Sequence, residues 1–325
     1  MKPSDLATTL RLVIRAKQPT FVWGPPGIGK SQIVQQTAAS ENLALIDIRA
    51  VLLDPVDLRG LPAVNGDGRA HWAIPEFLPR DGSGVLFLDE LNAAPALVQA
   101  SCYQLILDRK LGEYTLPDGW MVLAAGNRES DGAVTHRMPS ALRNRFVHLE
   151  AETDLDDWCK WALSANISPE VIAFLRFKPD LLHNFDKSAR AFPTPRSWEF
   201  VDRIAKQQPG PAIEHALFSG TVGEGAAVEF SAFLRLYREL PSIDAILLDP
   251  QNSPVPTNPA TCYAVATALA RRTTNRTIGS AITYLDRMQP EYSVMSVRDM
   301  VAHDSNLQSS PEFTRWAVNH SDVIF

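Results

Sequence analysis

The sequence predicts an α/β domain of buried strands and helices, followed by a domain of helices alone. Short apolar runs bounded by turn residues recur through about the first 150 residues, as expected for strands buried within a sheet. Beyond Glu150 the pattern changes to helical segments, and a length of 325 residues suits two domains. We therefore expect an α/β domain at 1–150 and a helical domain with a C-terminal extension at 151–325.

Composition and charge narrow the classes of protein. Hydrophobic residues at 45% and charged residues at 21% are typical of a soluble globular chain. A net charge of −6 argues against a surface dedicated to coating nucleic acid. No window approaches the ~20 apolar residues of a membrane helix, and the charged N-terminus does not resemble a signal peptide. The three cysteines form no C-x-x-C pair and the histidines never fall at H-x-x-x-H spacing. We therefore expect a cytoplasmic protein without disulfides and without a metal cluster of cysteines or histidines.

The N-terminal segment predicts a helix and then the first strand. Ser4 is a candidate N-cap, and Leu6, Leu10 and Ile14 fall on one helical face. The β-branched and aromatic run at 20–23 predicts a buried strand.

A glycine-rich turn follows that strand and precedes a helix predicted at 31–39, which is the context that the pattern G-x-x-x-x-G-K-[ST] requires in a phosphate-binding loop. Glycines let backbone amides curl around a polyphosphate, and the helix N-terminus adds partial positive charge. Lys30 is expected to reach the β- and γ-phosphates, and the Ser31 hydroxyl to bind Mg²⁺. The predicted nucleotide-binding residues are Gly24, Pro25, Pro26, Gly27, Ile28, Gly29, Lys30, Ser31 and Gln32.

An insertion is expected between the second and third strands. Residues 43–48 predict a second buried strand, and 50–84 is too long for a simple crossover. The turn residues Asn65-Gly66-Asp67-Gly68 predict a β-hairpin near 60–75, with Trp72 at one end. A decorated surface loop and a partner-contacting element both remain open for this segment.

Two carboxylates end the next strand. Val85 to Leu88 is a continuous apolar run, typical of a strand buried on both faces, and Asp89 and Glu90 follow it. Strand ends in open parallel sheets face the ligand crevice, so Asp89 is a candidate Mg²⁺ ligand and Glu90 a candidate to polarise the attacking water. Acidic residues often simply end strands, and the upstream phosphate loop is what favours the functional interpretation.

The chain then predicts a helix, a small hairpin and another strand. Residues 95–108 read as a helix with Leu97 and Cys102 among its apolar positions, and 110–119 as a second hairpin. The apolar run at 120–125 is followed by Asn127, which could orient the attacking water or serve only as a turn residue.

Three arginines are the remaining candidates. Arg143 and Arg145 precede the final strand and would act only if a neighbouring subunit offered its γ-phosphate to them. Arg196 lies in the first turn of a predicted helix, where a cation is electrostatically unfavourable, which hints at a phosphate partner.

In this order the motifs resemble those of the AAA+ ATPases. The stretch from Gly24 to Ser31 resembles Walker A, and the run ending in Asp89 and Glu90 resembles Walker B. Asn127 matches sensor 1, Arg196 matches sensor 2, and the segment at 143–145 matches the arginine finger. The resemblance implies a P-loop domain with a five-stranded parallel sheet, an all-α lid domain and assembly into hexameric rings.

Within that superfamily the chain is most similar to the MoxR-type branch. This resemblance rests on Asp57-Leu58-x-Gly60 before the insert, on Asp89-Glu90-Leu91-Asn92-x-x-Pro95, on Arg145-Phe146 and on Pro195-Arg196. Ala141-Leu142-Arg143-Asn144-Arg145-Phe146 instead resembles midasin- and dynein-type modules. It leaves open which arginine is the finger, and Arg145 is preferred because it adjoins Phe146. Residues beyond about 210 resemble no known motif.

The resemblance implies a Mg²⁺-dependent ATPase that remodels a partner protein, commonly one with a von Willebrand factor A domain. A nucleic-acid-dependent motor subunit is one alternative, which the acidic net charge disfavours. A non-hydrolytic nucleotide switch is the other, which the complete set of candidate catalytic residues disfavours.

Overall fold

The computed structural model describes residues 1–128, 131, 136 and 138–320, and the chain divides into two compact units, Met1–Thr153 and Asp154–Phe325. In the first unit the helices and strands are α1 (Pro3–Arg15), β1 (Thr20–Trp23), α2 (Lys30–Ser40), β2 (Ala44–Arg49), α3 (Pro55–Arg59), β3 (Leu61–Val64), β4 (Ala70–Ala73), β5 (Ser83–Asp89), α4 (Ala96–Asp108), β6 (Lys110–Leu111), β7 (Tyr114–Thr115), β8 (Gly119–Gly126), α5 (Ser140–Arg143) and β9 (Val147–Glu150). In the second unit they are α6 (Leu155–Ser164), α7 (Pro169–Phe177), α8 (Pro195–Ala205), α9 (Pro211–Val222), α10 (Glu224–Arg238), α11 (Ile243–Leu248), α12 (Pro259–Arg272), α13 (Ile278–Leu285), α14 (Pro290–His303) and α15 (Pro311–Asn319).

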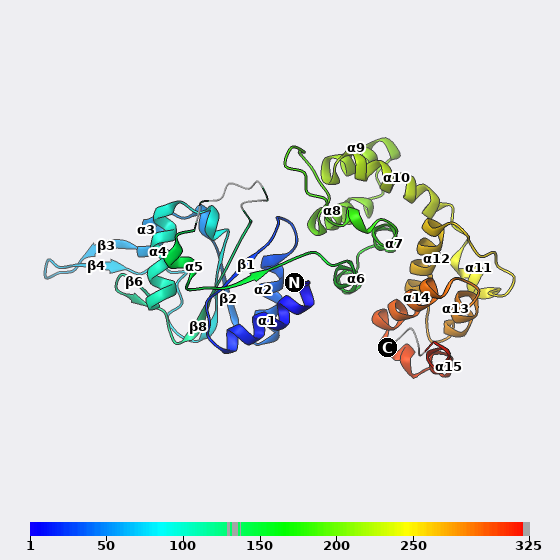
Figure 1. Ribbon diagram of the computed structural model, residues 1–325, viewed down its shortest axis with the longest axis horizontal. Coiled ribbons are helices and arrows are strands. Elements are labelled where there is room, and N and C mark those ends of the chain that lie inside the picture. Colours follow the sequence, from blue (N-terminus) through cyan, green and yellow to red (C-terminus); the bar gives the residue numbers. More distant parts are fainter. Residues whose placement is uncertain (129–130, 132–135, 137, 321–325) are drawn as a thin grey trace. The chain divides into compact units, whose positions relative to one another are not determined.

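Five parallel strands form the sheet of the first unit, in the order β2-β5-β8-β1-β9 (Figure 1). β1 lies between β8 and β9, and Trp23 is in register with Gly126 on one side and Glu150 on the other. The carboxyl ends of these strands therefore meet at one edge of the sheet, where ligands bind in open α/β folds. The predicted fold class, a five-stranded parallel α/β domain followed by helices, is confirmed.

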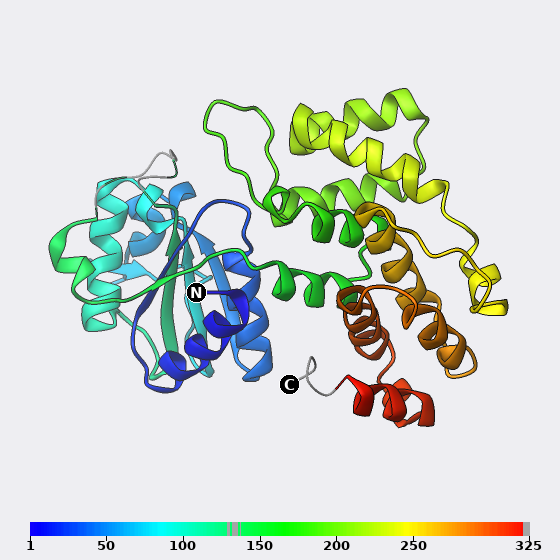
Figure 2. The same ribbon diagram turned by 45° about the vertical axis from the view of Figure 1, so that its right-hand side comes forward.

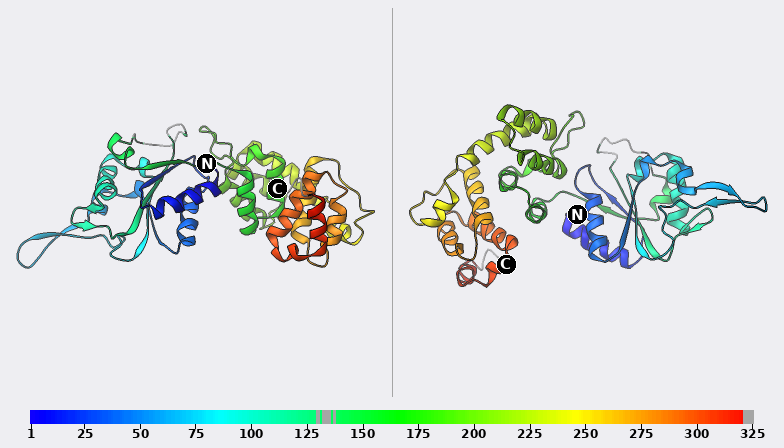
Figure 3. Two further views of the ribbon diagram at one scale, coloured as in Figure 1. Left: turned by 60° about the horizontal axis from the view of Figure 1, so that its bottom comes forward. Right: turned by 180° about the vertical axis from the view of Figure 1, so that it is seen from behind.

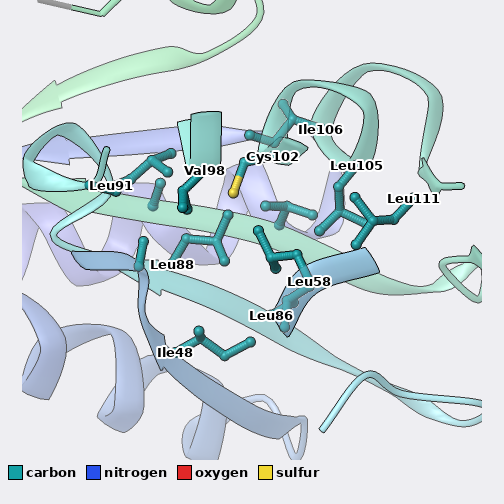
Figure 4. Packing of buried hydrophobic residues seen from close by; sticks show 14 of the residues in the cluster. Ile48, Leu58, Leu86, Leu88, Leu91, Val98, Cys102, Leu105, Ile106 and Leu111 are labelled. Atoms are coloured by element: carbon teal, nitrogen blue, oxygen red, sulfur yellow. The ribbon is translucent and has the colours of Figure 1, made fainter. Parts of the chain in front are cut away.

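The central strands are buried on both faces, which explains their continuous apolar runs. In β5, Leu86 and Leu88 pack on one face against α4, and Val85 and Phe87 pack on the other face in a cluster with α1 and α2. Figure 4 shows the α4 side of this core, with Cys102 among its aliphatic neighbours. Side chains alternate between the two faces of a strand, so each face needs its own helical cover.

Two local predictions were wrong, and one apolar position of a predicted helix faces solvent. The strand expected at 43–48 is not buried as a whole, because β2 forms the edge of the sheet and only Ile48 is buried. The N-cap of α1 is Lys2, with Pro3 as the first helical residue, and not Ser4. Leu97 is 71% exposed, since the buried face of α4 runs through Val98 instead.

A β-hairpin interrupts the crossover from β2 to β5. β3 and β4 pair antiparallel, and the turn between them closes with a hydrogen bond from the amide of Asn65 to the carbonyl of Arg69 at 2.8 Å. Gly60 starts the hairpin at φ +82°, and a Cβ there would lie 1.9 Å from the carbonyl oxygen of Ala73. Figures 1 and 3 show the hairpin projecting beyond the sheet of its own unit. β6 and β7 form a second, shorter hairpin.

Helices alone make up the described part of the second unit (Figure 2). Its core has two clusters, one built around Trp198, Phe174 and Phe230 and the other around Tyr284 and Leu269. A cavity of about 440 Å³ lies among α6, α7, α12 and α14.

A buried ion pair forms part of the wall of that cavity. The guanidinium of Arg176 on α7 donates to both carboxylate oxygens of Asp299 on α14, and Nη2 lies 2.8 Å from Oδ1. Burial opposes the charge, but the hydrogen bonds that the guanidinium donates to Asp299, together with the charge of that carboxylate, outweigh burial and raise the pKa of Arg176. The pair joins two helices that are far apart in the sequence.

The three cysteines are free thiols in three different clusters of the core. Cys102 belongs to the α4 side of the sheet, and Cys159 and Cys262 belong to the two clusters of the helical unit. Burial raises the pKa of Cys102 to about 12 and that of Cys159 to about 11. Among the described residues, no helix is long and apolar enough to cross a membrane.

Candidate nucleotide-binding site

The glycine-rich turn joins β1 to α2 as the sequence predicts. Gly29 lies at φ +94° directly before the helix, and Gly27 at φ +79°, both in a region that glycine tolerates best. A Cβ on Gly24 would lie 2.6 Å from Cδ1 of Ile28 and 3.0 Å from the carbonyl oxygen of Ala151, so a larger residue does not fit. No side chain caps the first turn of α2, a helix whose residues are all described. Its first amides are therefore available to an anion.

Lys30 is the first residue of α2 and is 9% exposed. Its ammonium donates to the carbonyl oxygens of Gly24 at 2.7 Å and Pro25 at 3.0 Å, within the loop itself. It also donates to Oδ1 of Asn127 at 3.0 Å. The structure therefore brings together Lys30 and Asn127, which are 97 positions apart in the sequence.

The Ser31 hydroxyl donates to Oδ2 of Asp89 at 2.6 Å, which joins the start of α2 to the end of β5. The second carboxylate oxygen, Oδ1, accepts the amide of Glu90 at 2.9 Å. Partial burial, and then the charge of Asp89, raise the pKa of Asp47 on the neighbouring strand β2. The Ser31 hydroxyl and the Asp89 carboxylate thus lie side by side, close to the carboxylate of Asp47. Such oxygens are the ligands that Mg²⁺ prefers, so these residues fit this ion.

Glu90 has a left-handed backbone, with φ at +56° and ψ at +32°. A non-glycine residue pays about 1 kcal/mol or more for this conformation, and such residues cluster at functional sites. The side chain is half-buried at the same strand edge as Asp89. The left-handed turn carries the chain from β5 into the 3₁₀ turn Leu91–Ala93.

Neither candidate finger arginine is joined to the loop within the described chain. Arg143 ends α5 and Arg145 follows it, and both are exposed, with no hydrogen bond or ion pair of either guanidinium to a described residue. Phe146 beside them is buried and anchors the segment to the core of the sheet. Arg196 belongs to the second unit, where it is the second residue of α8 and is exposed.

A histidine ties the arginine segment to the strand that precedes the loop. Nε1 of Trp23 lies 2.9 Å from Nδ1 of His148, and Nε2 of His148 lies 2.7 Å from the carbonyl oxygen of Arg143. An indole N–H only donates and a carbonyl only accepts, so the neutral His148 carries its proton on Nε2. No sequence pattern predicts this link, because it joins residues that are adjacent only across the sheet.

Two further residues were not predicted as part of the site. Arg128 pairs with Glu150 at 2.7 Å and donates to the carbonyl of Ala151, which joins the ends of β8 and β9. Asn92 is 2% exposed and donates from its side-chain amide to the carbonyl of Asn127 at 2.7 Å. Asn92 belongs to the MoxR-like run from Asp89 to Pro95, but only the fold reveals what it contacts.

Comparison with known proteins finds a family that resembles the first unit. Residues 19–146 match the model of the AAA domain, dynein-related subfamily. Midasin from Giardia intestinalis is 28% identical over 178 residues, which is 50% of this chain and 4% of that protein. The chain thus spans only a small part of the midasin that it matches. The MoxR-type branch stays a prediction.

Solved structures similar to this chain include NtrX from Brucella abortus in complex with ADP. It is 15% identical, with a TM-score of 0.43, and the match covers 98% of this chain and 67% of that one. A variant of RuvB from Thermotoga maritima is 16% identical, with a TM-score of 0.42, and the match covers 90% of this chain and 87% of that one.

Proposed function

We propose, from the match of residues 19–146 to the AAA domain model, that the protein is an AAA+ ATPase that depends on Mg²⁺ and hydrolyses ATP to ADP and phosphate. The observation that carries the proposal is the convergence of Lys30, Ser31, Asp89, Glu90 and Asn127 at adjacent strand ends. Each has the functional group that γ-phosphoryl transfer to water requires. The amides of the loop around Gly27 and Gly29 would bind the polyphosphate.

The proposed roles follow from the chemistry of each side chain. Lys30 now donates to neutral oxygens and would transfer its hydrogen bonds to the β- and γ-phosphates. Ser31 and Asp89 would hold Mg²⁺, which neutralises phosphate charge when bound. Glu90 would accept the proton of the attacking water, and Asn127 would orient that water.

The active site would be completed by a neighbouring copy of the chain. We assign the finger to Arg145, with Arg143 as the alternative, because both guanidinium groups are exposed and Phe146 fixes the segment that carries them. Arg196 at the start of α8 would contact phosphate from the helical unit, which would then act as a lid. This arrangement requires a homo-oligomer, and we propose a hexameric ring.

The hairpin β3–β4 is our candidate for contact with a partner or with the pore of a ring. Its apolar side chains face solvent, with Leu61 65%, Val64 72% and Trp72 41% exposed. Exposed apolar side chains gathered on a projecting element are typical of an interaction site. In line with the MoxR-type motifs, we propose that this protein is cytoplasmic and that its partner has a von Willebrand factor A domain, which ATP turnover remodels.

The test is ATP turnover per subunit, measured with Mg²⁺ over a wide range of protein concentration, with Glu90→Gln as the control for contaminating activity. We expect a rate per subunit that rises with concentration as copies assemble. Arg145→Ala should keep nucleotide binding and slow hydrolysis by ~10³-fold, within the range known for arginine fingers. A flat rate from a protein that sizes as a monomer would exclude an arginine acting between copies. An absence of turnover at every concentration would overturn the ATPase and favour a nucleotide switch.

A further inference from the structure

Asn92 links two of the loops that follow the strands of the sheet. It lies in the 3₁₀ turn Leu91–Ala93, two residues after Glu90, and is 2% exposed. Its side-chain Nδ2 donates to the main-chain carbonyl of Asn127 at 2.7 Å. Its own main-chain carbonyl accepts the amide of His136 at 2.7 Å. A single buried residue thus connects the end of β5 to the segment after β8.

The orientation of the Asn92 amide follows from its partner. A carbonyl only accepts, so the nitrogen of the side chain must face Asn127 and the oxygen must face away from it. Oδ1 therefore lies against Gly126, where a Cβ would approach it to 1.9 Å. Any side chain at position 126 would displace Asn92, which explains the glycine at the end of β8.

The same side chain is a poor choice for stability alone. Oδ1 of Asn92 is buried and has no hydrogen-bond partner among the described residues. Burying an unpaired amide oxygen costs free energy that an apolar side chain of similar size would not. A side chain that leaves a buried polar atom unpaired calls for an explanation, and a functional role supplies one.

We infer that Asn92 is a positioning residue for ATP hydrolysis, which sets the distance between Glu90 and Asn127. This inference rests on the proposed function of those two residues. Glu90 and Asn92 belong to one short turn, and the left-handed backbone at Glu90 fixes how that turn leaves β5. By holding the carbonyl of Asn127, Asn92 holds the backbone from which the Asn127 side chain reaches Lys30. The proton acceptor and the water-orienting amide are thereby kept in register.

The first experiment replaces Asn92 by leucine, which has a similar volume and cannot hydrogen-bond. We expect kcat for ATP to fall ~10- to 100-fold, since small misplacements of catalytic groups have effects of this size. The Kd for ADP should stay within about twofold, and the melting temperature should change little, because removal of the unpaired oxygen offsets the lost hydrogen bond to the carbonyl of Asn127. Asn275→Leu, at an exposed asparagine of the second unit, is the matched control and should hydrolyse ATP at the wild-type rate. A lower melting temperature together with weaker ADP binding would show a merely structural role and overturn the inference.

The second experiment asks whether Asn92 acts through Asn127. Asn127→Ala and the double variant Asn92→Leu/Asn127→Ala complete a double-mutant cycle. The double variant should be no slower than the slower single variant, because the group that Asn92 positions is already absent. Multiplicative effects would mean that the two residues act independently, and the inference would fail.

A third variant displaces Asn92 without altering it. Gly126→Ala puts a methyl group where Oδ1 now lies, so the same loss of kcat with unchanged ADP affinity is expected. Normal turnover by Gly126→Ala would contradict the inference. Normal turnover by both Glu90→Gln and Asn127→Ala would instead contradict the proposed function itself. Normal turnover by Asn92→Leu, with those two variants slow, would remove the inference alone.

Discussion

Two buried cations of this protein are held in opposite ways. In the first unit, the ammonium of Lys30 donates to two main-chain carbonyls and to the amide oxygen of Asn127. In the second unit, the guanidinium of Arg176 donates to both oxygens of the Asp299 carboxylate. Both cations are largely withdrawn from water, with Lys30 9% exposed and the Arg176 side chain 12% exposed.

We call the charge of Lys30 exchangeable, because a ligand can take over its hydrogen bonds. We call the ion pair of Arg176 committed, because it is part of the fold. Lys30 donates to carbonyl and amide oxygens, and a phosphate is a stronger acceptor that can replace them. A bidentate carboxylate neutralises Arg176 and fixes its geometry, so α7 and α14 stay joined. A buried charge is therefore evidence for function only when its partners are considered.

Breaking the committed pair should have the largest effect on stability. Asp299→Ala leaves the guanidinium of Arg176 buried without its carboxylate, which typically costs about 3–5 kcal/mol. Urea unfolding followed by far-UV circular dichroism measures the loss. Replacing both partners, Arg176→Met with Asp299→Leu, should recover most of it, because no unpaired charge remains. An equal loss of unfolding free energy in the single and double variants would mean that the unpaired charge of Arg176 is not the cause of the loss.

Removing the exchangeable cation should instead affect the ligand. Lys30→Ala should weaken ATP binding ~100-fold, because about 3 kcal/mol of charge-assisted hydrogen bonding to phosphate is lost. Isothermal titration with ATP and Mg²⁺ measures the change. Lys178→Ala removes a lysine that pairs with Glu229 on the surface of the second unit, and it should bind ATP normally. Equal affinities of wild type and Lys30→Ala would place the phosphate elsewhere.

A smaller change sharpens the same contrast at the Ser31–Asp89 contact. Ser31→Ala deletes the hydroxyl and leaves the carboxylate, so the Mg²⁺ concentration for half-maximal turnover should rise ~10-fold, as one oxygen ligand worth about 1.4 kcal/mol is lost. A Mg²⁺ titration of the ATPase rate at saturating ATP measures this shift. An unchanged Mg²⁺ requirement would remove Ser31 from the metal site.

The smallest effect is expected for an ion pair on the surface. Glu199 and Arg203 are paired one turn apart on α8, and the Arg203 side chain is 65% exposed. Glu199→Ala should change the free energy of unfolding by no more than about 0.5 kcal/mol, because solvent screens the pair. The same urea titration provides the measurement, and a loss comparable to that of Asp299→Ala would refute the distinction between buried and exposed pairs.

Much of the first unit could be predicted because its residues act through local patterns. The strand at Thr20–Trp23 and the turn at Asn65–Gly68 follow from residue type and order alone. The convergence of Ser31 and Asp89 follows from parallel strands that end at one edge. The hydrogen bonds of Asn92 and His148 could not be predicted, because each joins segments whose proximity depends on the order of the strands.

The second unit was less predictable for a related reason. Its helices are recognisable one at a time, but Arg176 and its partner Asp299 are 123 positions apart in the sequence, and no periodicity connects them.

In the first unit, the exposure of β2 depends on its place at the sheet edge, which the apolar run at 43–48 does not encode.

The three buried thiols give three of the four clusters of the core a chemical reporter each. Cys102, Cys159 and Cys262 lie in different clusters, so each becomes alkylated only when its own surroundings open. The rate at which an alkylating reagent labels each site, read by peptide mass spectrometry, measures the free energy of that local opening. Added nucleotide should slow the labelling of Cys102 beneath the sheet by mass action. The unmodified chain can therefore report how far a ligand at the strand ends stabilises each of these three clusters.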